Sequence, residues 1–100
     1  MKVVINRCYG GMGISRAAAE HMGIRYDGDD YGLKDHMILD DNIERHDPRL
    51  VKAVEDLGSE AASGKLAKLA IEELPDDVIY EIDNHDGMES IASYRYPEDL

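Results

Sequence analysis

The stretch from Lys2 to Ala19 constrains the fold of this chain most strongly. It begins with the β-branched run Val3–Ile5, places three glycines between positions 10 and 13, and reaches a helix start at Ser15. Because glycine adopts backbone angles that other residues resist, this order predicts a strand, a tight turn, and a helix whose N-terminus faces the end of the strand. Such a junction can bind an anion through free backbone N–H groups, or it can be a packing corner without a ligand.

The polar residues and glycines of this junction form the first candidate site, which we interpret as a place for a nucleotide or phosphate. Its ligand-binding candidates are Asn6, Arg7, Cys8, Tyr9, Gly10, Gly11, Gly13 and Ser15. The dinucleotide fingerprint is incomplete, because Arg16 stands at the position of its third glycine. Gly64-Lys65 does not fit a P-loop either, since Leu66 stands where Ser or Thr would hold magnesium.

Cys8 is the single cysteine of the chain, so it cannot form an intrachain disulfide. A thiolate at the end of a strand near a helix N-terminus is stabilised, which makes a reactive thiol one interpretation. None of the four histidines has a spacing to Cys8 that is typical of a catalytic pair or a zinc site. We therefore favour a buried, structural Cys8 that reacts slowly with thiol reagents, and we expect no metal and no other cofactor.

Charge limits the classes of partner. The chain carries 22 acidic residues against 11 lysines and arginines, which gives a formal net charge of -11. A nucleic-acid backbone or an anionic membrane surface attracts a basic patch, so we expect neither direct nucleic-acid binding nor membrane binding. A basic protein surface is compatible with this charge. No signal peptide or membrane span is recognisable, and the cysteine usage fits a reducing cytoplasm.

Two acidic stretches supply candidates for contact with a basic partner. One lies in the irregular segment 24–47, and the other lies between Leu69 and Tyr94, where the sequence contains no Lys or Arg. The segment from Asp27 resembles the start of a calcium loop, but Ile38 stands where a bidentate glutamate belongs. An acidic surface is often only a solvated face, and that interpretation stays open. The partner-binding candidates are Asp27, Asp29, Asp30, Asp76, Asp77, Asp83 and Asp86.

Two helices are predicted from capping residues and apolar spacing. The first runs from Ser15 or Arg16 to Met22, with Ser15 as its N-cap and Gly23 in the left-handed position that follows a helix. Its short length means that it depends on tertiary packing.

The second helix begins at Asp47-Pro48, where aspartate is a good N-cap and proline suits the first helical position. Gly64 is its expected end, although Gly58 can end it earlier. Its apolar stripe consists of Leu50, Val51, Val54, Leu57 and Ala61.

Strands are predicted at residues 66–73, 78–83 and 88–96, with a brief strand at 37–39. For the hairpin we prefer the three-residue loop His85-Asp86-Gly87, which pairs Tyr80 with Ala92 and keeps one apolar face. The alternative two-residue loop pairs Tyr80 with Ser93. Together with the N-terminal strand, these strands predict one α+β domain over residues 1–100. A small mixed or antiparallel sheet, made of the N-terminal strand and a three-stranded C-terminal meander, packs against two helices.

The opening segment, KVVINRCYGGMGIS from Lys2 to Ser15, resembles the start of a family of small tailed-bacteriophage and prophage proteins. This chain departs from the family pattern at Met12, where an aromatic residue is more usual. It departs again at Tyr94-Arg95-Tyr96, where a His-Arg and Trp pattern is more usual. The resemblance implies a phage accessory gene product and transfers no catalytic residue. Further matching pieces are Asp47-Pro48, Leu50-Val51, Glu55-Asp56-Leu57-Gly58, Leu74-Pro75-Asp76-Asp77-Val78 and Asp86-Gly87.

Three functions are compatible with these features, and a binding role is favoured over an enzyme because no complete catalytic constellation is present. The first is a phage accessory protein that binds and inhibits a host protein, such as a defence nuclease complex, in the cytoplasm of the bacterial host. The second is a small protein that binds or transforms a nucleotide or phosphate ligand at Asn6-Arg7-Cys8 and the glycine turn. The third is a structural phage component. Self-association is left open.

Overall fold

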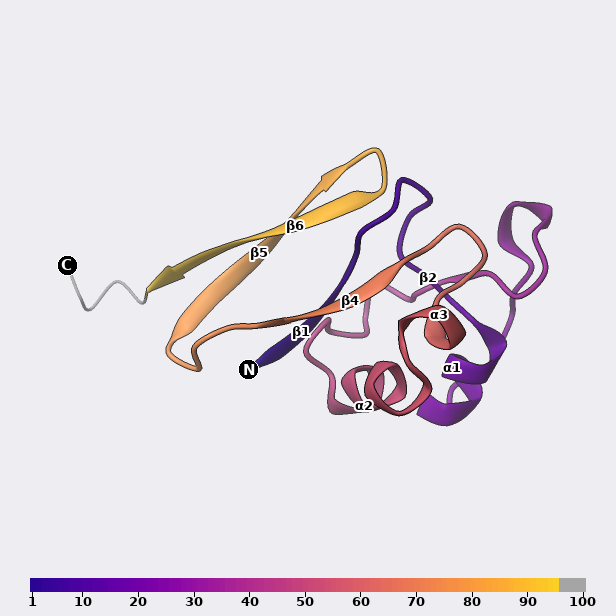
Figure 1. The fold of residues 1–100 in the computed structure, drawn as a ribbon, viewed down its shortest axis with the longest axis horizontal. Coiled ribbons are helices and arrows are strands. Elements are labelled where there is room, and N and C mark those ends of the chain that lie inside the picture. The colour runs from indigo at the N-terminus through magenta and orange to yellow at the C-terminus, as the bar shows by residue number, and fades with distance from the viewer. Residues whose placement is uncertain (96–100) are drawn as a thin grey trace.

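The computed structural model describes residues 1–95, so the predicted strand position Tyr96 lies outside the described residues. Within that range the chain forms three α-helices, a short 3-10 helix and three antiparallel two-stranded sheets (Figure 1). This confirms the α+β fold class. The sheet formed by β1 and β4 lies between the helices and the long β5–β6 hairpin (Figure 1).

The central sheet pairs β1 (Lys2–Asn6) with β4 (Leu69–Glu73), with Val4 opposite Ile71. Val3, Val4 and Ile5 are all fully buried, which confirms that this strand is covered on both faces. The pairing of the N-terminal strand with the 66–73 segment was predicted, although β4 starts three residues later than expected.

Helix α1 (Arg16–Met22) begins and ends as its sequence predicts. The hydroxyl of Ser15 accepts a hydrogen bond from the backbone N–H of Ala18 at 3.1 Å, and Gly23 adopts the left-handed φ of 74°. Both features satisfy backbone groups that have no partner inside the helix.

Helix α2 (Pro48–Leu57) has the predicted start, because the carboxylate of Asp47 accepts from the backbone N–H of Arg49 at 2.8 Å. It ends at Gly58, the earlier of the two expected positions, and Gly64 is not its cap. Gly58 has a φ of 85°, and the chain turns there into the separate helix α3 (Ser59–Ala62). The turn brings Ala62 back to α1, where its carbonyl accepts from the backbone N–H of Ser15 at 2.9 Å.

A second small sheet joins the glycine turn to the irregular segment. Strand β2 (Gly13–Ile14) pairs with β3 (Met37–Ile38), which confirms the brief strand expected near residue 37. The 3-10 helix η1 (Asp30–Gly32) precedes β3 in the chain.

The third sheet is the hairpin of β5 (Val78–His85) and β6 (Met88–Arg95), and its predicted register is wrong. Tyr80 lies opposite Ser93 and Ile82 opposite Ile91, so the loop is the two-residue Asp86-Gly87. Both loop residues have positive φ, 55° and 95°, which is the turn geometry that matches the twist of a hairpin. The three-residue loop was preferred because it keeps one face of the hairpin apolar. The inward face, however, also carries the buried acid Glu89.

The predicted single sheet is also wrong, since β4 and β5 do not pair and the hairpin forms a sheet of its own. The second edge of β1 is already occupied by other groups. The backbone N–H of Val4 donates to the carbonyl of Arg45 at 2.8 Å, and the backbone N–H of Asn6 donates to Glu89 at 2.8 Å. The side chain of Glu89, in β6, therefore accepts a hydrogen bond from β1 that a backbone carbonyl of a neighbouring strand would accept in a continuous sheet.

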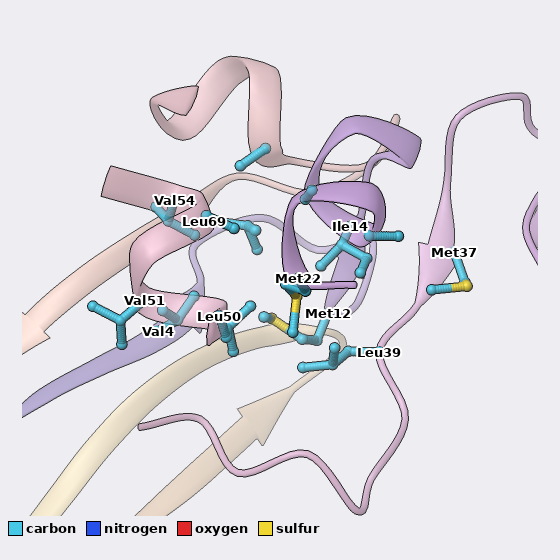
Figure 2. Close-up of a cluster of buried hydrophobic side chains, with 14 residues drawn as sticks. Val4, Met12, Ile14, Met22, Met37, Leu39, Leu50, Val51, Val54 and Leu69 are labelled. Atoms are coloured by element: carbon cyan, nitrogen blue, oxygen red, sulfur yellow. The ribbon is translucent and has the colours of Figure 1, made fainter. Parts of the chain in front are cut away.

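The hydrophobic core lies between α1, α2, β1 and β4 and contains aliphatic and methionine side chains (Figure 2). The chain has no Phe or Trp, and the adaptable Met12, Met22 and Met37 fill space between the elements. Val54 is 5% exposed and marks the face of α2 that packs on this core.

Candidate functional site

Asn6, the first of the ligand-binding candidates, uses its polar atoms inside the protein. Its side-chain amide donates to the carbonyls of Cys8 at 2.6 Å and Gly87 at 2.7 Å. Its oxygen accepts from the backbone N–H groups of Cys8 at 3.2 Å and Lys68 at 2.9 Å. With the side chain fully buried, Asn6 joins the end of β1 to the hairpin turn and to the loop before β4.

Arg7 and Tyr9 follow Asn6 but point to different surroundings. Arg7 forms an ion pair with Glu72 on the neighbouring strand β4, whereas Tyr9 is 64% exposed. The backbone around Tyr9 packs against the hairpin turn, where a Cβ at Gly87 would lie 2.3 Å from the carbonyl oxygen of Tyr9 and 2.6 Å from the backbone nitrogen of Gly11. The glycine turn thus receives the tip of the hairpin.

The N-terminus of α1 is already occupied by side chains of the protein. The hydroxyl of Ser15 caps the helix and donates to the carbonyl of Ala61 at 2.7 Å. The backbone N–H of Arg16 donates to the carboxylate of Asp35 at 2.7 Å. The position considered for a bound anion therefore holds an internal carboxylate.

Gly13 and Gly64 enclose a histidine that the sequence analysis did not single out. A Cβ at Gly13 would lie 2.1 Å from Cε1 of His36, and a Cβ at Gly64 would lie 2.4 Å from Nδ1 of the same ring. His36 is fully buried, and its Nδ1 accepts from the backbone N–H of Leu66 at 3.3 Å. No local pattern points to this contact, because the glycines lie in segments far apart in the sequence.

Cys8 is half-buried, so the expectation of a buried thiol is wrong. Strand β1 ends at Asn6, and Cys8 lies past that end, in the turn, where it borders a cleft of about 920 Å³. Helix α3 contributes Ser59 to the wall of this cleft, and the following loop contributes further residues.

The first group of acidic candidates stabilises the segment before β3. Asp27 forms an ion pair with Arg25 at 2.8 Å, and Asp29 accepts from the backbone N–H of Asp35 at 3.2 Å. The carboxylate of Asp30 accepts from the backbone N–H of Ile38, in β3, at 2.7 Å. These acids therefore have structural partners.

The second group of acidic candidates is divided between a turn and the hairpin. The N-terminal ammonium of Met1 contacts Asp76 at 2.6 Å and lowers the pKa of that carboxyl. Asp77 is exposed in the same turn, and Asp83 and Asp86 are exposed on the hairpin. Asp76 and Asp77 lie apart from the first group, since η1 and the β4–β5 turn lie toward opposite ends of the molecule (Figure 1).

The hairpin is attached to the rest of the protein through its inward face. Glu89 is 3% exposed and forms a bidentate ion pair with Arg45. Farther along the hairpin, the hydroxyl of Tyr80 lies 2.6 Å from Nδ1 of His46. Burial, with a further contribution from Glu44, raises the pKa of Tyr80.

Comparisons with known proteins give no match among protein-family models, curated proteins or solved structures. In residues 1–95, no helix is long and apolar enough to cross a membrane. The same part of the chain contains no group of three or more His, Cys, Asp or Glu side chains that could hold a metal ion.

Proposed function

We propose that this protein acts by binding a basic surface of another protein through the outward face of the β5–β6 hairpin. This outward face is defined by Ile79, Glu81 and Asp83 of β5, with Asp86 in the turn at its end. All four are exposed, and Ile79 is 44% exposed. The proposal rests on one observation: acids and an apolar residue are exposed together on one face of a hairpin whose other face is attached to the rest of the protein.

The anchoring supports a binding role because it holds the outward face in place before a partner arrives. Glu89 and Asn6 connect the hairpin to β1, and His46 contacts Tyr80 nearer its other end. A pre-organised surface loses less conformational entropy on binding than a mobile one. An isolated two-stranded hairpin is only marginally stable, so these contacts are needed for a defined surface.

The charge of the hairpin favours a basic partner. From Leu69 to Tyr94 the sequence has eight acids and no Lys or Arg. Each exposed ion pair contributes only about 0–1 kcal/mol to affinity. Together, however, acids on one face accelerate association with a basic surface, and salt screens this effect.

The resemblance to phage and prophage proteins supports a host protein as the partner, in the cytoplasm of the bacterial host. Enzymes that bind nucleic acid present basic grooves to the phosphate backbone. A defence nuclease complex is therefore the class of target that we propose, and occupation of its groove is the proposed mode of inhibition.

The test compares two variants that remove equal charge. The hairpin variant carries Glu81→Gln, Asp83→Asn and Asp86→Asn. The control carries Glu20→Gln, Asp41→Asn and Glu73→Gln, which are exposed acids outside the hairpin. The wild-type protein is used to capture partners from bacterial lysate, and association of the captured protein is then measured with each variant at low and high salt.

We expect the hairpin variant to associate at least about tenfold more slowly at low salt, with the control close to wild type. The difference should shrink at high salt. Equal slowing by the two variants, or binding that ignores both substitution and salt, would contradict a hairpin-directed role.

A further inference from the structure

We propose that the cleft beside Cys8 is a binding site for a small phosphorylated molecule of nucleotide size. No residue of the hairpin is among those that line it, and it does not depend on the binding role proposed above. Its walls come from the turn after β1, from the loop before β3, and from α3 with the loop that follows it.

The distribution of positive charge points to this cleft. Among the described side chains, Lys34, Lys65 and Lys68 have no acidic partner, and all three border the cleft. The guanidinium of Arg16 lies 4.3 Å from the ring centre of Tyr26. The remaining described basic side chains are in ion pairs, namely Lys2, Arg7, Arg25, Arg45, Arg49 and Lys52.

Such a cluster is unexpected in a chain with 22 acidic residues. Of the four described Lys and Arg side chains without an acidic partner, three border this one cleft. An excess of positive charge on the wall of a cleft attracts a negatively charged ligand. The three lysines therefore favour an anion with several charges.

The loop that carries two of these lysines is fixed by hydrogen bonds along its length. Gly64 donates from its backbone N–H to the carbonyl of Gly13 at 3.0 Å. The backbone N–H of Lys68 donates to the buried side chain of Asn6 at 2.9 Å, and the carbonyl of Lys68 accepts from the backbone N–H of Arg7 at 2.8 Å. The backbone positions of the lysines are thus set, while their flexible stems can adjust to a ligand.

The acids on the cleft wall reduce its excess of positive charge to one unit. Asp35 and Glu60 border the cleft, against three lysines. One carboxylate oxygen of Asp35 already accepts from the backbone N–H of Arg16 at 2.7 Å. Glu60 lies in the first turn of α3 and is exposed to solvent.

Size and chemistry narrow the ligand class. A volume of about 920 Å³ is within the range of small-molecule pockets, and is large enough for a nucleotide. Lysine binds phosphate as a point charge, so three lysines suit a di- or triphosphate better than a single carboxylate. Because Lys65 follows a helix instead of preceding one, the site differs from a P-loop.

The test uses sodium ATP as the probe, with inorganic pyrophosphate and adenosine as comparison ligands, measured by calorimetry at low salt. The cleft variant carries Lys34→Gln, Lys65→Gln and Lys68→Gln. The control variant carries Lys2→Gln, Arg25→Gln and Lys52→Gln, which remove the same charge elsewhere. Circular dichroism establishes that both variants are folded, and iodoacetamide labelling of Cys8 reports whether a ligand occupies the cleft.

We expect ATP and pyrophosphate to bind the wild-type protein and adenosine to bind at least about tenfold more weakly than ATP. The cleft variant should lose about tenfold or more in ATP affinity, and the control variant should retain it. ATP should also slow the labelling of Cys8.

Several results would overturn the assignment. No binding of ATP or pyrophosphate at about 1 mM would do so, as would adenosine binding as tightly as ATP. Equal losses in the two variants would show general charge attraction instead of a site. Binding of ATP without protection of Cys8 would place the ligand outside this cleft.

Discussion

Arg45 and Glu89 hold the hairpin to the protein through two parallel hydrogen bonds, 2.5 Å from Nη1 to Oε1 and 2.7 Å from Nη2 to Oε2. The same carboxylate accepts from the backbone N–H of Asn6, so three chain segments meet at one side chain. A buried carboxylate is costly without partners, and here each partner lies on a different element from Glu89. The position of the hairpin is therefore tied to this ion pair.

Replacing Glu89 should destabilise the protein strongly. Glu89→Ala leaves Arg45 without its acid and Asn6 without its acceptor, and removing one partner of a buried pair costs about 3–5 kcal/mol. Chemical denaturation measures the change in the free energy of unfolding. Lys52→Ala, which removes an exposed pair with Asp56, is the control and should change the free energy of unfolding much less. Similar costs for the two variants would show that the Glu89 pair does not anchor the hairpin.

Asn6→Asp should be more destabilising than its small change in shape suggests. An aspartate cannot donate to the carbonyls of Cys8 and Gly87, and each buried polar group left unpaired costs about 1–3 kcal/mol. We expect a loss of about 2–4 kcal/mol in the free energy of unfolding. Asn84→Asp is the matched control, because Asn84 contributes only an accepting oxygen to the backbone N–H of Gly87. A control that costs as much as Asn6→Asp would contradict this role.

Gly64→Ala should destabilise the protein by overpacking, since its Cβ would lie 2.4 Å from the ring of His36. Overpacking of a buried site costs about 1–3 kcal/mol, which thermal or chemical unfolding can measure. In a His36→Ala background the ring is absent, so the additional cost of Gly64→Ala should fall to what remains from the backbone carbon of Gly13, which lies 3.0 Å from the same Cβ. An unchanged cost in that background would mean that the histidine does not require the glycine.

Helix α2 should respond differently to changes at its core face and at its cap. Val54→Asp places an unpaired charge in the core and should cost several kcal/mol, about 3 or more. Asp47→Ala removes only the N-cap and should cost about 1 kcal/mol. Equal, negligible shifts in denaturation midpoint would show that α2 is not docked on the core.

The N-cap should also make α2 sensitive to acid. Hydrogen bonds from Arg49 lower the pKa of Asp47 from its ordinary value of 3.8. The charged carboxylate therefore stabilises the folded state above that value, and this stabilisation is lost as the pH falls through the lowered pKa. The difference in unfolding free energy between wild type and Asp47→Asn should be larger at pH 7 than in strong acid. A difference independent of pH would exclude a contribution from the charge.

The sequence alone determined those features whose signals lie close together in the chain. Ser15, Gly23 and Asp47 act on backbone groups only a few positions away, so the starts of α1 and α2 and the end of α1 could be predicted. The run Val3–Ile5 identified a covered strand for a similar reason, because its apolar residues occupy both faces.

Tertiary structure decided how these elements combine. In the observed hairpin register Glu89 is buried and pairs with Arg45 of another segment, and an acidic residue in a strand gives no sign that it will be buried. His36 and its two glycines come from three segments that are distant in the chain, and the three lysines around the cleft come from two loops; only the fold brings them together. Local propensity is a property of neighbouring residues, whereas burial, ion pairing and cleft formation depend on contacts between residues distant in the chain.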